Sequence, residues 1–399
     1  MSKPQTDAIR IRTTQTNEME HSSPLYLTSS FCFDDAESMR AAFADETDDN
    51  IYSRFSNPNV QEFTDKICAL EGAEAGYATA SGMSAVFGSF MALLKKGDHL
   101  LSCNSIFGST HTVIAKYLPN YGIDTSYVLA TATEAEWEAA ITPNTKVLYC
   151  ETVSNPLLEV ADIASLAKIA KKHNIKLVVD NTFSPLSVAP AKLGADIVIH
   201  SLTKYINGSS DTVGGVVCAS QEFINSLKNV NDGASMLLGP TMDSLRSASV
   251  MKNLRTLHIR MKQHSHNAMH LANKFEADGI KTVYPGLSSH PSHEIYKTMI
   301  NPEYGFGGMM TIDVGTLDKA NALMELMQQK NLGYLAVSLG FYKTLFSAPG
   351  TSTSSEIPLE EQAEMGLTDG LIRFSIGLDN DIERTYQMMK QCMIELGVL

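Results

Sequence analysis

The segment HSLTKYINGSSDTVGGVV (residues 200–217) places one lysine, Lys204, directly after an apolar run that ends at Ile199. Two hydroxyl side chains, Ser201 and Thr203, precede this lysine. An ammonium group at the end of a buried strand is costly to desolvate unless it is paired or covalently engaged. A desolvated lysine can form a Schiff base, and neighbouring hydroxyls can bind a phosphate. Considered alone, a lysine in a polar loop is more often a surface residue.

Two other segments place polar groups at the ends of expected elements. The run IKLVVD ends at Asp180, whose carboxylate could hold a protonated heterocyclic nitrogen. Ser81, Gly82 and Met83 begin a long apolar segment that we expect to be a buried helix. The free N–H groups and the dipole at a helix start favour a phosphate. A turn cap and a plain helix N-cap are the alternative interpretations of these two features.

Arg373 is the single charged residue in the apolar run LIRFSIG (371–377). Its planar guanidinium can form a bidentate pair with a carboxylate, and a structural ion pair is the alternative. Together the four features supply a lysine for an aldehyde, a phosphate site, a carboxylate for a ring nitrogen and an arginine for a substrate carboxylate. Pyridoxal 5'-phosphate (PLP) requires this set of groups. The sequence therefore predicts a PLP enzyme with an amino-acid substrate.

The elements that must position these residues alternate along the middle of the chain. Short β-branched runs predict strands at 99–103, 124–129, 146–152, 175–182, 195–201 and 214–220, with helical patterns such as 161–173 between them. This alternation predicts an α/β fold with a mostly parallel sheet flanked by helices. Ligands of such sheets bind beyond the C-terminal strand ends, where Asp180 and Lys204 are expected.

Three regions are expected along the chain. Residues 1–56 predict an N-terminal arm of extended chain with a short helix, and residues 57–255 form the α/β domain just described. Residues 256–399 predict a smaller C-terminal α+β domain. Its expected strands lie at 307–315, 334–340 and 371–377, and its expected helices at 258–279, at 317–330 and in a final segment that ends near Leu396.

Composition argues against several other classes of protein. The formal net charge of −13 disfavours a nucleic-acid backbone or an anionic membrane as partner. The longest apolar segment, residues 78–94, is shorter than the roughly 20 residues of a membrane span. The N-terminus lacks an apolar signal core, and the six scattered cysteines favour reduced thiols. We therefore expect a cytoplasmic globular protein.

No metal site is expected. The acidic residues between Asp34 and Asp49 lack the glycine turn and the ligand spacing of a calcium loop. His290 and His293 lie three residues apart in a Ser/Pro loop without further ligands nearby in the sequence.

Ordered motifs extend from about residue 20 to the C-terminus. They are YSRFSNPN (52–59), ALEGAE (69–74), ASGMSA (80–85), GDHLL (97–101), ETVSNP (151–156), VVDNTFSP (178–185), LGADIVIHSLTKYINGSSD (193–211), TLHIRM (256–261), AVSLG (336–340) and LTDGLIRFSIGLDN (367–380). In these motifs the chain resembles the Cys/Met-metabolism (trans-sulfuration) family of PLP enzymes. That family includes cystathionine γ-synthase, cystathionine γ-lyase, methionine γ-lyase and the homoserine-ester sulfhydrylases. The resemblance implies the aspartate-aminotransferase-like fold (fold type I).

The resemblance also implies a role for each matching residue. Lys204 corresponds to the Schiff-base lysine that later moves a proton, and Asp180 to the partner of the ring nitrogen. Tyr52 and Arg54 correspond to residues that reach the phosphate of the neighbouring subunit. This implies sites shared between chains in a homotetramer built from two dimers. The phosphate is expected at Ser81, Gly82, Met83, Ser201 and Thr203, and the substrate carboxylate at Asn155, Ser338 and Arg373.

The family usually has a tyrosine stacked on the cofactor ring, and this chain has Phe107 there. Phenylalanine can stack but has no hydroxyl for proton transfer. Methionine γ-lyases typically follow with a cysteine, where this chain has Ser109. Phe107 resembles the O-succinylhomoserine sulfhydrylase branch and favours γ-replacement of the acyloxy group of an O-acylated homoserine by sulfide, which gives homocysteine. The alternatives are γ-elimination, as in methionine or cystathionine γ-lyase, and the cystathionine γ-synthase reaction.

Two segments depart from the family pattern near the expected substrate entrance. The loop Ala348–Ser354 lacks both histidines that the family usually has. Leu245-Arg246-Ser247 stands where the family has Pro-x-Asp-Ala. The acyl group and the sulfur donor therefore stay open at the level of sequence.

Overall fold

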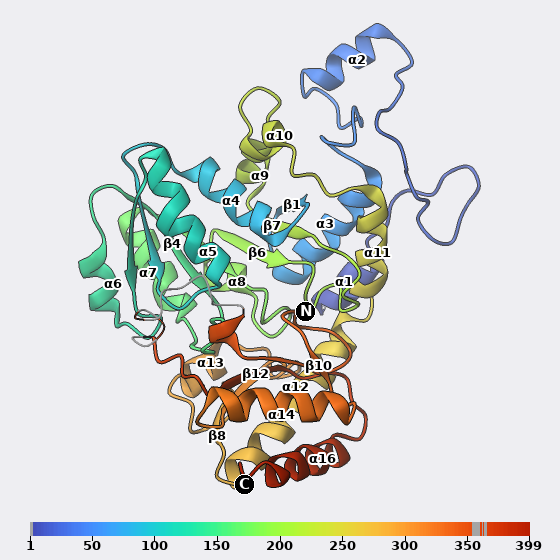
Figure 1. Ribbon diagram of the computed structural model, residues 1–399. Coiled ribbons are helices and arrows are strands. Elements are labelled where there is room, and N and C mark those ends of the chain that lie inside the picture. The colour runs from blue at the N-terminus through green and yellow to red at the C-terminus, as the bar shows by residue number, and fades with distance from the viewer. Residues whose placement is uncertain (1–2, 353–359, 361, 363–364) are drawn as a thin grey trace.

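A seven-stranded sheet forms the centre of the computed structural model, which describes residues 3–352, 360, 362 and 365–399 (Figure 1). Its strand order is β1-β7-β6-β5-β4-β2-β3, and every strand except β7 runs in the same direction. The strands are β1 (Ala75–Thr79), β2 (His99–Cys103), β3 (Asp124–Val128), β4 (Thr145–Glu151), β5 (Lys176–Asp180), β6 (Ile197–Ser201) and β7 (Gly215–Ala219).

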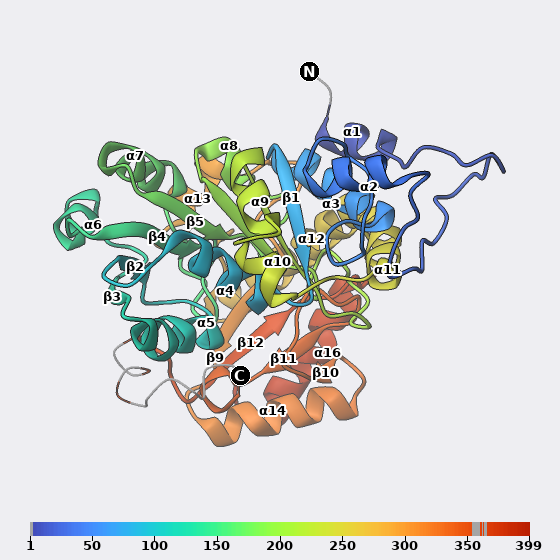
Figure 2. The same ribbon diagram turned by 90° about the horizontal axis from the view of Figure 1, so that it is seen from above.

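Helices cover both faces of this sheet, so its strands are apolar on both sides. Figure 2 shows α3, α7 and α8 on one face and α4 and α5 on the other. Their bounds are α3 (Pro58–Glu71), α4 (Gly82–Leu93), α5 (Gly108–Thr112), α7 (Ile163–His173) and α8 (Pro190–Leu193). Further helices on this part of the chain are α6 (Glu134–Ala140), α9 (Gln221–Lys228), α10 (Ala234–Leu238) and α11 (Ser244–Leu254). The buried strands explain why the sequence shows continuous apolar runs instead of alternation.

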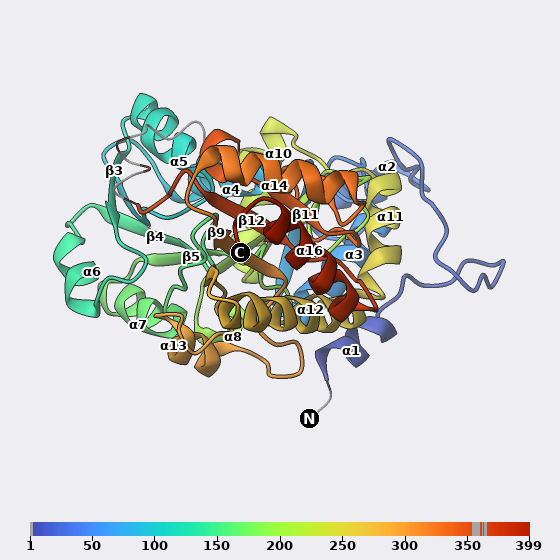
Figure 3. The same ribbon diagram turned by 60° about the horizontal axis from the view of Figure 1, so that its bottom comes forward.

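A second sheet, of order β10-β11-β12-β9-β8, packs around a hydrophobic cluster of its own. Figure 3 shows α12, α14 and α16 lying over it. The strands are β8 (Lys281–Val283), β9 (Met309–Asp313), β10 (Tyr334–Leu335), β11 (Leu345–Ser347) and β12 (Leu371–Ser375). The helices are α12 (Leu257–Ala277), α13 (His293–Met299), α14 (Leu317–Gln329) and α16 (Ile382–Glu395).

The N-terminal arm extends away from the rest of the chain and carries α2 (Ala36–Phe43) at its far end (Figure 1). Besides this short helix the region also forms α1 (Pro4–Arg10), which the sequence analysis did not predict. Lys66 of α3 fastens α1 by donating hydrogen bonds from Nζ to the carbonyl oxygens of Ala8 and Ile11. None of the described helices is long and apolar enough to cross a membrane.

The predicted mostly parallel sheet is confirmed, with three corrections. Residues 78–94 do not form one helix, because the apolar stretch continues β1 through Thr79 before α4 starts at Gly82. The run at 214–220 enters the sheet antiparallel, as β7. The expected strand 334–340 stops at Leu335, and its chain then leaves the sheet. At Gly340 the backbone passes so close to Tyr205 that a Cβ would lie 2.4 Å from the Tyr205 nitrogen.

Candidate active site

A cavity of about 220 Å³ lies at the C-terminal ends of β4, β5 and β6, beside the start of α4 and facing β12. This is the position that an open α/β sheet offers to a ligand. Residues from both sheets line the cavity. The predicted site residues among them are Ser81, Gly82, Met83, Phe107, Asn155, Asp180, Ser201, Thr203, Lys204 and Arg373.

Lys204 follows the end of β6 in a tight turn and projects its amine into the cavity. Its Nζ donates a hydrogen bond of 3.3 Å to Oγ of Ser338, which brings this third predicted carboxylate-binding residue to the site. Burial, together with the positive charge of Arg373, lowers the pKa of Lys204 to about 8. A lysine with such a pKa has a substantial neutral fraction near neutral pH, as a nucleophilic amine requires.

Asp180 is the last residue of β5 and lines the floor of the cavity. Its Oδ1 accepts a hydrogen bond from the Thr182 backbone N–H at 2.9 Å. Burial raises the pKa of Asp180, while the hydrogen bonds from Thr182 lower it. A buried carboxylate of this kind is stabilised by a cation that enters the cavity, such as a protonated ring nitrogen.

The start of α4 packs against the end of β6. The Ser81 hydroxyl caps α4 by accepting from the Ser84 backbone N–H at 3.1 Å. A Cβ at Gly82 would lie 2.9 Å from the Cβ of Ser201, so this approach requires glycine. Thr182 Oγ1 accepts a hydrogen bond from the Ser201 N–H at 2.8 Å and thereby fixes the end of β6, which leads into the turn with Thr203. The five residues Ser81, Gly82, Met83, Ser201 and Thr203, which the sequence analysis predicts to bind the phosphate, all line the cavity and are called the phosphate cradle below.

Arg373 enters the cavity from the second sheet and is 2% exposed. Its Nη1 donates to Oδ1 of Asn155 at 2.8 Å, and its Nη2 donates to the carbonyl oxygen of Val337 at 3.1 Å. Its buried Nε has no hydrogen-bond partner among the described residues. Burial lowers the pKa of Arg373 to about 10. A substrate carboxylate would supply the acceptor that this guanidinium lacks.

Phe107 lines the cavity just before α5, and its ring brings no hydroxyl to the site. Its backbone N–H donates to Oε1 of Glu151 at 2.7 Å. Glu151 also lines the cavity but does not follow from the sequence analysis, although it lies within ETVSNP. Its signal was the same as that of Asp180, a carboxylate that ends a buried strand. The two residues are register partners on β4 and β5.

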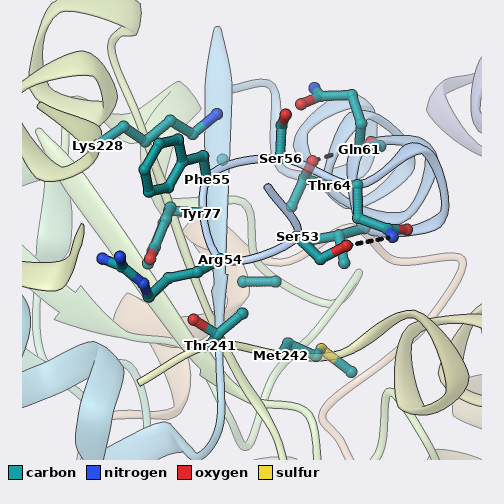
Figure 4. Close-up of a pocket in the computed structure, with 14 residues that line it drawn as sticks. Ser53, Arg54, Phe55, Ser56, Gln61, Thr64, Tyr77, Lys228, Thr241 and Met242 are labelled. Atoms are coloured by element: carbon teal, nitrogen blue, oxygen red, sulfur yellow. Dashed lines mark hydrogen bonds between the residues drawn. The ribbon is translucent and has the colours of Figure 1, made fainter. Parts of the chain in front are cut away.

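Tyr52 and Arg54 do not line the cavity that holds Lys204. Figure 4 shows Arg54 in a separate pocket beside Tyr77. Its Nη1 donates to the carbonyl oxygen of Met236 at 2.8 Å, and its guanidinium lies 5.1 Å from the centre of the Phe55 ring. Within one chain these two residues are thus apart from the other predicted cofactor-binding residues.

A model of the Cys/Met metabolism PLP-dependent enzyme family matches residues 5–392. The chain belongs to this family. O-succinylhomoserine sulfhydrylase of Pseudomonas aeruginosa is 41% identical over 377 residues, which cover 94% of this chain and 91% of that protein. Methionine gamma-lyase of Arabidopsis thaliana is 38% identical over 375 residues, with 92% and 85% covered. Cystathionine gamma-lyase of Bacillus subtilis is 41% identical over 333 residues, with 82% and 85% covered.

Solved structures agree on the fold. A Campylobacter jejuni protein described as an O-acetylhomoserine (thiol)-lyase superposes with a TM-score of 0.91 at 28% identity, covering 98% of this chain and all of that one. It carries a pyridoxyl phosphate on a lysine. The predicted fold, the PLP cofactor and an enzyme of sulfur amino-acid metabolism are therefore confirmed. The buried donor at Arg373, the carboxylate at Asp180 and the close approach at Gly82 fit PLP, whose bound ring withdraws electrons from the substrate.

The departures from the family pattern now have positions in the enzyme. Arg246 donates from Nη1 to the carbonyl oxygen of Ala80 at 3.3 Å and from Nη2 to that of Thr241 at 3.1 Å, just before the phosphate cradle. In the other departing loop, Ala348 is buried at the end of β11. The last two residues of that loop, Thr353 and Ser354, lie outside the residues that the structure describes.

His290 and His293 have backbone partners, and His293 is the first residue of α13 and not part of a loop. His290 Nε2 lies 3.1 Å from the carbonyl oxygen of Leu158, and His293 Nδ1 lies 3.0 Å from that of Pro285. The His293 ring also stacks on Phe306 with the ring centres 5.3 Å apart.

Proposed function

We propose that this enzyme replaces the acyloxy group of an O-acylated homoserine with sulfide and releases homocysteine, as an O-succinylhomoserine sulfhydrylase does. The observation that most directly supports this proposal is that Phe107 lines the cavity and has no hydroxyl group. An acyloxy group leaves as a weakly basic carboxylate and needs little help from an acid. A thiol leaving group is far more basic and benefits from a general acid. A ring without a hydroxyl therefore favours substrates with the better leaving group.

In this proposal the substrate carboxylate binds beside Lys204, at Arg373, Asn155 and Ser338. The hydrogen bonds described above hold Asn155 to Arg373 and Ser338 to Lys204. Lys204 carries the cofactor and then moves a proton from Cα of the substrate, because its lowered pKa lets the amine accept and return it near neutral pH. Asp180 holds the ring nitrogen protonated, and the phosphate cradle anchors the other end of the cofactor. Phe107 stacks on the ring.

The assembly that we propose is a homotetramer of two dimers, in which Tyr52 and Arg54 reach the phosphate of the neighbouring chain. Their separation from Lys204 within one chain supports this arrangement. The exposed side chains Leu25, Leu27, Phe43 and Tyr52 on the arm give it an apolar surface that a second copy would cover. We place the enzyme in the cytoplasm, because its six cysteines are free and five of them are buried.

An activity panel tests the proposed reaction. The purified enzyme is given O-succinylhomoserine or O-acetylhomoserine with sulfide or with cysteine, and methionine or cystathionine alone. We expect homocysteine from an acylated homoserine with sulfide as the main product. Formation of 2-oxobutanoate from methionine or cystathionine at a higher kcat/KM would overturn the proposal in favour of a γ-lyase. Cystathionine as the main product would overturn it in favour of a synthase.

The variant Phe107→Tyr tests the observation itself. Restoring a hydroxyl at this position should raise elimination from methionine by roughly 100-fold relative to replacement, the lower end of the usual contribution of a positioned acid. An unchanged ratio of the two activities would show that Phe107 does not set the reaction.

A further inference from the structure

Glu151, the last residue of β4, hydrogen-bonds the backbone of two separate loops. Its Oε1 accepts from the Phe107 N–H at 2.7 Å, and its Oε2 accepts from the Asn155 N–H at 3.0 Å. Both N–H groups are fixed in place by the same carboxylate, which is 7% exposed. The loop that carries the ring-stacking residue is thereby held against the loop that carries the substrate-binding amide.

The connection continues to the second sheet. Asn155, held by Glu151 through its backbone, accepts from Arg373 Nη1 through its side-chain oxygen at 2.8 Å. A displacement of Glu151 would therefore move the acceptor that orients the Arg373 fork. The same displacement would release the backbone N–H of Phe107, the residue before α5.

This arrangement is electrostatically costly. Glu151 lies beside Asp180, its register partner on β5. Burial and the negative charge of Asp180 raise the pKa of Glu151 well above its usual range, against the opposing effect of the two N–H donors. A glutamine has the same shape and would avoid the cost of a buried carboxyl group beside Asp180. Its side chain offers only one acceptor, however, so its NH₂ group would face one of the two backbone N–H groups. Two acceptors at this reach require a glutamate.

We propose that Glu151 is a positioning residue for substrate binding, which sets the Arg373–Asn155 fork relative to Phe107. The inference rests on the proposed function only in placing the substrate carboxylate at Arg373. It does not depend on which γ-reaction follows. Glu151 acts through the two loops and is assigned no contact with the substrate.

The test compares Glu151→Gln with a matched control, Asp98→Asn. Asp98 is also a buried carboxylate, 7% exposed, and it accepts a backbone N–H from Lys95 at 2.9 Å. It precedes β2, at the opposite end of the sheet from the cavity. Both holoenzymes are titrated with L-alanine, which has the carboxylate and amine of the substrate but no γ-leaving group. Binding is followed by the cofactor absorbance, and the circular dichroism of the same band reports the orientation of the ring.

We expect Glu151→Gln to keep PLP bound while its dissociation constant for L-alanine rises roughly tenfold or more, the effect of leaving one buried backbone N–H without its acceptor. The dichroism band should change with it, and KM should rise more than kcat falls. Asp98→Asn should stay within twofold of the wild type in each measurement. An unchanged alanine affinity and dichroism band in Glu151→Gln would overturn the inference.

The variant Glu151→Asp keeps the inference testable if the glutamine variant fails to fold. Aspartate retains both acceptors but is one methylene shorter, so one of the two N–H bonds is lost or lengthened. We expect an intermediate rise in the alanine dissociation constant, and wild-type affinity would contradict the positioning role. Wild-type enzyme that binds alanine but makes no homocysteine would refute the proposed function alone.

Discussion

In the role proposed for it, Lys204 combines two demands at the scale of a single residue, because its amine is buried beside Arg373 and must still react. Its lowered pKa, about 8, meets both. The folded protein without cofactor then binds fewer protons than the unfolded chain between about pH 8 and the usual lysine pKa of about 10.4. The associated cost to stability is fully present below pH 8 and disappears as the pH rises through this range.

The pH dependence of cofactor attachment measures this pKa directly. Only the neutral amine attacks an aldehyde, so the rate at which cofactor-free enzyme takes up PLP should rise up to about pH 8 and then level off. Stopped-flow absorbance at the cofactor band gives this profile, and Lys204→Ala should show no covalent uptake. A rate that continued to rise to pH 10 would mean that the lysine titrates normally.

The sequence was most informative for residues that end or begin a regular element. Asp180 ends β5, Lys204 follows β6 and Gly82 begins α4, and a pattern of apolar runs locates all three. Ser338 could be matched only by resemblance, since the 3.3 Å contact between its Oγ and Lys204 joins positions 134 residues apart. Glu151 carries the same signal as Asp180, a carboxylate that ends a buried strand, but the sequence does not show that its side chain joins the backbones of two loops.

At the scale of elements, the close contact between α4 and β6 determines the shape of the phosphate cradle. Replacing Gly82 with alanine would set a Cβ 2.9 Å from the Ser201 Cβ and 3.1 Å from its Cα, so one of the two elements must shift. We expect the affinity for PLP to fall roughly tenfold while the protein stays folded, as overpacking of about 1 kcal/mol or more implies. Equilibrium titration of the cofactor-free protein measures the change.

A matched substitution in the same helix is Gly88→Ala. The added Cβ would approach only the Ser235 hydroxyl, at 2.8 Å, and a serine side chain can rotate away. Alanine also favours the helix more than glycine does. The affinity for PLP should therefore stay within twofold of the wild type. An equal loss in both variants would show that α4 tolerates no added volume at all and that the cradle contact is not special.

Helices and strands were predicted well where the chain is apolar on both faces. They were predicted poorly where tertiary contacts determine the direction or the end of a strand. Strands β2 to β6 follow from short runs of mostly apolar residues. The direction of β7 does not, because a strand of the same composition can pair either way. Residues 336–340 read as a strand, but the approach of Gly340 to the Tyr205 backbone draws them out of the sheet toward Lys204. Short strands such as β8, of three residues, give no periodic signal.

At the scale of the whole molecule, the two sheets have separate hydrophobic clusters and meet at the cavity. The arm departs from this body (Figure 1), and Tyr52 lies in the segment between α2 and α3. If each site is shared between chains, Lys204 and Arg54 of one subunit serve different sites. Defects in the two residues should then be separable in a mixed oligomer.

Mixing unfolded Lys204→Ala and Arg54→Ala chains and refolding them tests this arrangement. Each variant alone should retain little activity. A mixed dimer would contain one site with both defects and one intact site, so random pairing should restore about a quarter of the wild-type activity. Refolding each variant alone is the control. No recovery in a mixture shown to contain mixed oligomers would place Arg54 and Lys204 in the same site.

The unpaired Nε of the buried Arg373 has a consequence for which molecules the enzyme ignores. A cell contains many primary amines that can condense with a pyridoxal aldehyde. An amine that has lost its carboxylate would leave a desolvated guanidinium donor without an acceptor, and sites built to hydrogen-bond a missing group reject such analogues by about 10⁴-fold. The same arginine that orients the amino acid would thus keep decarboxylated amines from consuming the cofactor.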